Sequence, residues 1–95
     1  MNFKDTEAKR AGDSIRELRL RKKLSPREFA CDANLTEEYL KLLEEGHEDK
    51  VSDEIMERIL QAGGVHTRGK YTSDDLKRVI LSISPPNPPG KIKLF

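Results

Sequence analysis

The sequence predicts an all-α domain of five helices, and three observations support this fold class. Apolar residues recur at helical spacing in five separate stretches of the chain. A residue suited to the N-cap position precedes most of these stretches, and Gly or Asn follows several of them. No convincing pair of alternating strands is found. The 95 residues suffice for one domain, with an N-terminal arm over residues 1–12, the helical domain over 13–83 and a Pro-rich tail over 84–95.

The first two helices are expected near residues 13–23 and 26–33. In the first, Ile15 and Leu18 are three residues apart with charged residues between them, which is typical of an amphipathic helix. The residues before it fit either a frayed helix or a flexible arm. Before the second, Ser25 can act as the N-cap, the following proline suits the first helical position, and a glutamate three residues later completes a capping box.

The third and fourth helices are marked by their caps. Asn34 suits a left-handed helix end, and Thr36 suits the N-cap of a helix over about residues 37–45 that ends at a glycine. Ser52 then predicts a helix over residues 53–62, which two glycines end.

The fifth helix is expected to begin at a capping box formed by Thr72 and Asp75. The proline-rich segment over residues 84–90 cannot be helical and predicts a stiff, extended tail. Residues 91–95 alternate charged and apolar side chains, which fits an edge strand.

Charge is distributed unevenly, although the formal net charge is only +1. Residues 1–30 carry nine basic and five acidic side chains, residues 31–57 carry two and ten, and residues 58–95 carry seven and two. An acidic middle segment is unusual for a nucleic-acid-binding protein, which normally presents a basic face.

Several classes of protein and site are not indicated. No run of ~18 apolar residues predicts a membrane helix, and the first residues lack the apolar core of a secretory signal. Cys31 has no partner for an internal disulfide, so we expect a soluble, cytoplasmic protein. His47 and His66 are isolated, and no catalytic triad, phosphate loop or spaced carboxylate pair is present. We therefore expect no enzyme activity, metal or cofactor.

Two short helices joined by a tight turn, at residues 26–33 and 37–45, have the lengths of a helix-turn-helix. The surrounding motifs are IRELR from residue 15, LS from 24, FA from 29, YL from 39 and LEEG from 43. Together they resemble the repressor/Cro-like family, also called the XRE family, over roughly half of the chain. The resemblance implies a repressor-like fold.

The resemblance also implies sequence-specific binding of double-stranded DNA by a homodimer on a two-fold operator, most often as a repressor. The implied base-reading residues are Glu37, Glu38, Lys41 and Leu42. The implied phosphate-contacting residues are Arg16, Ser25, Arg27, Lys50 and Ser52. Arg19 and Glu44 are expected to form a structural ion pair. We expect the dimer surface on the fifth helix, whose apolar residues equally fit closure of the monomer core: Leu76, Val79, Ile80 and Ile83.

The chain departs from the family where Pro26 replaces a common glutamine and where Glu37 and Glu38 replace Gln, Ser or Arg. A glutamate can accept a hydrogen bond from cytosine N4, but the same carboxylates can instead complement the helix dipole or meet a basic protein. Two alternatives follow. One is a protein-interaction adaptor or antiactivator that does not bind DNA and uses the acidic segment 31–57. The other is the antitoxin of a toxin–antitoxin pair.

Overall fold

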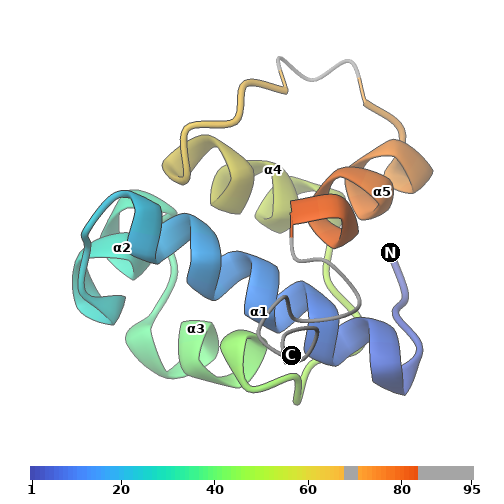
Figure 1. Ribbon diagram of the computed structural model, residues 1–95, viewed down its shortest axis with the longest axis horizontal. Coiled ribbons are helices and arrows are strands. Elements are labelled where there is room, and N and C mark those ends of the chain that lie inside the picture. The colour runs from blue at the N-terminus through green and yellow to red at the C-terminus, as the bar shows by residue number, and fades with distance from the viewer. Residues whose placement is uncertain (68–70, 84–95) are drawn as a thin grey trace, which may run out of the picture.

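The computed structural model describes residues 1–67 and 71–83, and these form five helices (Figure 1). The helices are α1 (Asp5–Arg21), α2 (Pro26–Asp32), α3 (Glu37–Glu44), α4 (Asp53–Ala62) and α5 (Ser73–Ile83). The described ranges contain no strand, and a single antiparallel bridge joins Asn2 to Lys50. The predicted all-α, five-helix class is confirmed. The predicted tail and its edge strand, over 84–95, lie outside the described residues.

The caps read from the sequence are present at the helix starts. The Ser25 hydroxyl accepts a hydrogen bond from the Glu28 N–H at 3.1 Å, and the Glu28 carboxylate accepts one from the Ser25 N–H at 2.9 Å. Thr36 and Ser52 cap α3 and α4 in the same way, each at 3.1 Å. Asn34 ends the α2 segment at a φ of 58°, in the left-handed conformation predicted for it.

The predicted start of the first helix is wrong, because α1 begins at Asp5 rather than near residue 13, and of the two alternatives for the residues before it the helix is the one observed. The chain before it is also held in place: Phe3 is 5% exposed, and its N–H donates to the Asp49 carbonyl at 2.7 Å. The expected arm over residues 1–12 is therefore the first half of α1 and a packed segment leading into it. Gly12, which weakens the sequence signal for a helix, lies inside α1.

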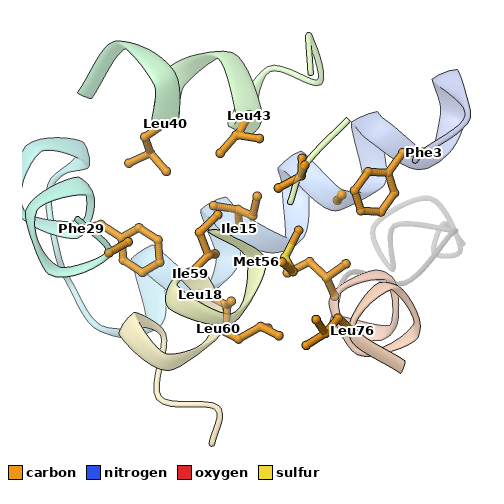
Figure 2. Packing of buried hydrophobic residues seen from close by; sticks show 14 of the residues in the cluster. Phe3, Ile15, Leu18, Phe29, Leu40, Leu43, Met56, Ile59, Leu60 and Leu76 are labelled. Atoms are coloured by element: carbon orange, nitrogen blue, oxygen red, sulfur yellow. The ribbon is translucent and has the colours of Figure 1, made fainter. Parts of the chain in front are cut away.

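The core forms around α1, with α3 on one side and α4 and α5 on the other (Figure 1). Figure 2 shows side chains from every helix meeting there, among them Leu18, Phe29, Leu40, Met56 and Leu76. None of the helices in the described part of the chain is both long and apolar enough to span a bilayer.

Two of the residues expected on a dimer surface belong to this core. Leu76 and Ile80 are fully buried within the monomer, so neither is available to a second subunit in this conformation. Val79 and Ile83 pack against the core and stay partly exposed. An amphipathic pattern indicates that one face of a helix is buried, but it does not show whether the same chain or a second subunit buries it. In α5 that face packs against α1 and α4 of the same chain.

Candidate nucleic-acid interface

The α2–turn–α3 unit is a helix-turn-helix whose turn is tightly packed. The Leu35 N–H donates to the Ala30 carbonyl at 2.8 Å, and Ala33 at the end of α2 is fully buried. A side chain larger than alanine at position 30 or 33 would push α2 and α3 apart. The small residues therefore fix the angle at which α3 leaves α2.

Arg58 of α4 also holds this turn, a role that was not predicted. Its Nε donates to the Ala33 carbonyl at 2.9 Å and one terminal nitrogen donates to the Asn34 carbonyl at 3.4 Å. These bonds satisfy carbonyls that the end of α2 leaves without helical partners. No local sequence signal predicts the contact, because the residues are more than twenty positions apart.

The inner face of α3 is anchored to α1 by a buried carboxylate. Glu44 is 7% exposed, and its two oxygens accept from Arg19 at 2.8 and 3.1 Å. Arg16 Nε lies 3.5 Å from the same carboxylate. Arg19 also donates to the Leu24 carbonyl at 3.2 Å. The two arginines and their hydrogen bonds compensate the cost of burying the charge, so α3 is held in one position relative to α1.

The outer face of α3, extended by its C-cap residue, carries four exposed side chains at helical spacing: Glu38, Lys41, Leu42 and Glu45. Three of the four base-reading candidates thus share one face. The fourth, Glu37, lies beside it and is paired with Lys41, whose Nζ is 3.7 Å from Glu37 Oε2. Leu42 is 40% exposed, less than Leu20 of α1 at 55%, so its apolar side chain is accessible to a partner on this face.

The phosphate-contacting candidates divide into engaged and exposed residues. The Ser25 and Ser52 hydroxyls cap their own helices. The Glu28 carboxylate also occupies the start of α2, where it would repel a phosphate. Arg27 and Lys50 are exposed, while Arg16 turns its Nε toward Glu44.

Lys22 and Lys23, which were not among the predicted contacts, are exposed in the turn before α2. Lys23 has a φ of 57°, a left-handed conformation that glycine adopts more readily than lysine. The run of three basic residues over 21–23 was a visible signal for this cluster. It gives the start of the helix-turn-helix positive charge that the loop after α3 lacks.

Tyr39 lies on the side of α3 next to that loop. Burial raises the pKa of its hydroxyl, and the charge of Glu48 raises this pKa further. The phenol is therefore neutral and can donate a hydrogen bond throughout the ordinary pH range. Across the described residues there is no pocket and no group of three side chains able to hold a metal ion. The candidate interface is therefore the exposed face of α3 and the turns beside it.

Comparison with known proteins gives a structural likeness. Two solved structures of the clp gene regulator ClgR from Corynebacterium glutamicum are similar to this chain, each at 23% sequence identity. For one, the TM-score is 0.63, and the match covers 81% of this chain and 70% of the ClgR chain. For the other, the TM-score is 0.62, and the match covers 83% of this chain and 92% of the ClgR chain. No protein-family model and no curated protein sequence matches the chain. The chain therefore shares the helical fold of a gene regulator.

Proposed function

We propose that this chain is a DNA-binding transcriptional regulator of the repressor/Cro-like kind, which represses by placing α3 in the major groove of its operator. The observation that carries the proposal is the outer face of α3. Its side chains are exposed in a row, while its inner face is locked by Glu44 to two arginines of α1. A rigidly held, exposed second helix is what a helix-turn-helix uses to reach base edges.

In this proposal Arg27 and Lys50, together with Lys22 and Lys23, supply the phosphate contacts. All four are exposed: Arg27 lies in the first turn of α2, while Lys22 and Lys23 precede the α2–α3 unit in the chain and Lys50 follows it. Phosphate contacts set the register of a protein on the duplex and provide most of the non-specific affinity. Ser25 and Ser52 then have capping roles and contribute to binding through the helices that they begin.

The regulator is further proposed to act as a homodimer on a two-fold operator, because one short module contacts too few bases for useful specificity. Of the predicted dimer residues, Val79 and Ile83 on α5 keep accessible surface and are the proposed contact. Light scattering of the purified chain at micromolar concentration should give twice the monomer mass. The mass of one chain without DNA, together with the mass of one chain per duplex when DNA is present, would remove the dimer from the proposal.

The test of the proposed function is binding to the DNA upstream of the gene encoding this chain, titrated at two salt concentrations against a scrambled duplex. We expect sequence-selective binding that weakens steeply with salt. Lys41→Glu and Lys50→Glu should each weaken it, with Arg78→Glu at an exposed position of α5 as the matched charge reversal outside the helix-turn-helix. Absence of binding at low salt would exclude this regulator function at that site.

One observation favours a second candidate, a protein-interaction adaptor that does not bind DNA. Glu38 and Glu45 outnumber Lys41 on the outer face of α3, and the following loop adds Glu48 and Asp49. Such a surface is complementary to a basic protein. An adaptor would fail the DNA titration, and its partner contact would weaken when Glu38 or Glu45 is neutralised.

A further inference from the structure

We infer that Glu38, and not the adjacent Glu37, reads a cytosine in the operator, and that Leu42 reads a thymine methyl group within one or two base pairs of it. The inference rests on the proposed function and adds the base preference of the half-site. It follows from the different surroundings of two neighbouring carboxylates in the first turn of α3.

The two glutamates differ in what already occupies them. Glu37 is half-exposed and paired with Lys41 one turn later, at 3.7 Å. The side chain of Glu38 is exposed and has no hydrogen bond or ion pair with any residue in the described ranges. The exposed pair is weak, but it places an ammonium group beside the Glu37 carboxylate, whereas Glu38 keeps every acceptor site of its carboxylate open.

The chemistry of the major groove selects cytosine for such a group. An ionised carboxylate only accepts hydrogen bonds, so it needs a donor on the base edge. Cytosine presents its N4 amino group as a donor, while guanine and thymine present acceptors that repel a carboxylate. Adenine presents a donor with the N7 acceptor beside it, a pattern that suits an amide better than a carboxylate. Glu38 therefore discriminates in favour of cytosine.

Leu42 extends the same row by one helical turn. It follows Glu38 at the i+4 position and leaves 40% of its surface exposed. The two residues are displaced by ~6 Å along the helix axis, which corresponds to about two base steps of ~3.4 Å. The thymine methyl group is the apolar feature of the major groove, so an exposed leucine there favours thymine.

The experiment selects binding sites from a library of randomised DNA duplexes with the full chain, and then measures Kd for duplexes that differ at single base pairs. We expect the wild-type protein to select a C and, one or two pairs away, a T. In the Glu38→Gln variant the C should become an A, with a change of about tenfold in the ratio of the two Kd values. Leu42→Ala should remove the preference for T and leave the preference for C.

Glu37→Gln is the matched control, because it removes the same charge from the adjacent residue and also releases Lys41. Both Gln variants should bind non-specific DNA more tightly than wild type, since each removes one negative charge near the phosphates. Only Glu38→Gln should replace the selected C, whereas Glu37→Gln should keep the C even if the released Lys41 changes the preference at another position. An unchanged C with Glu38→Gln, or loss of the C with Glu37→Gln, would overturn the inference while leaving the proposed function intact. Selection of no sequence by the wild type would overturn both.

Discussion

Gly12 of α1 packs against the main chain of Glu44 in α3, with no space for a side chain between them. A Cβ atom at Gly12 would lie 2.5 Å from the Leu43 carbonyl oxygen and 2.6 Å from that of Glu44. Both neighbours are backbone atoms, which cannot turn away as a side chain can. The close approach brings α1 near enough for Arg19, two turns further on, to reach the Glu44 carboxylate.

Gly12→Ala should therefore destabilise the fold even though alanine is the better helix former. Alanine gains up to ~1 kcal/mol of helix propensity, but overpacking of the crossing should outweigh it and leave a net loss of about 2 kcal/mol. Urea unfolding followed by circular dichroism measures the difference. Asp13→Ala, at the exposed neighbouring position, is the control and should change stability by no more than about 0.5 kcal/mol. A Gly12→Ala variant as stable as wild type would show that the helices separate freely.

Removal of the Glu44 carboxylate should cost far more stability than removal of an exposed one. Glu44→Ala leaves Arg19, with only 12% of its side chain exposed, without its partner, and we expect a loss of about 3 kcal/mol. Glu17→Ala breaks the ion pair between Glu17 and Arg21. Both of these side chains are about half-exposed, so the loss of stability should be less than ~1 kcal/mol. Thermal unfolding of both variants gives the comparison. Equal losses would mean that the buried position of Glu44 contributes nothing.

Local features of the sequence were enough to predict most of the fold. Ser25 and Glu28 make both bonds of a capping box, and Thr72 and Asp75 make the corresponding pair at α5. These interactions join residues three positions apart, so they depend little on the rest of the chain. Asn34 likewise adopts its left-handed conformation from its own short side chain.

The features that were not predicted depend on residues distant in sequence. The start of α1 is set by the burial of Phe3 and by Glu7, which pairs with Lys77 of α5 at 3.0 Å. Gly12 has low helix propensity, and its presence inside α1 is explained by the close crossing of α1 with α3. In the candidate interface, the sequence placed Glu37 and Glu38 together, and the i,i+4 pair with Lys41 distinguishes them in the structure.

The contact between α1 and α5 should make stability depend on pH in the acid range. The Lys4 N–H donates to the Glu7 carboxylate at 2.9 Å, and Lys77 is the next contributor; together they hold the pKa of Glu7 below its ordinary value of 4.5. A lowered folded-state pKa stabilises the fold above the unfolded pKa, and this contribution is lost as pH falls below about 4.5 and through the folded pKa. Glu7→Gln should therefore be less stable than wild type at pH 7.

The difference between Glu7→Gln and wild type should shrink as the pH falls, since both side chains are then uncharged. Urea unfolding at several pH values between 7 and 3 measures it. Lys77→Met is the companion variant: it keeps the bond from the Lys4 N–H and should retain part of the pH dependence. A difference that stays constant over this range would show that the charge of Glu7 does not stabilise the fold.

Arg27 should contribute one phosphate contact if the chain binds DNA through its helix-turn-helix. Its side chain is exposed in the first turn of α2. Each neutralised phosphate adds about 0.9 to the slope of log K against log salt, so Arg27→Gln should lower that slope by about 1 and weaken binding equally for all sequences. Arg78→Gln removes the same charge from α5, where the 78% exposed side chain pairs with Asp75 at 3.5 Å, and should leave the slope unchanged. Titration of the operator and of a scrambled duplex at four salt concentrations gives both slopes. Equal reductions by the two variants would mean that binding responds to net charge alone and that Arg27 has no specific place at the phosphate backbone.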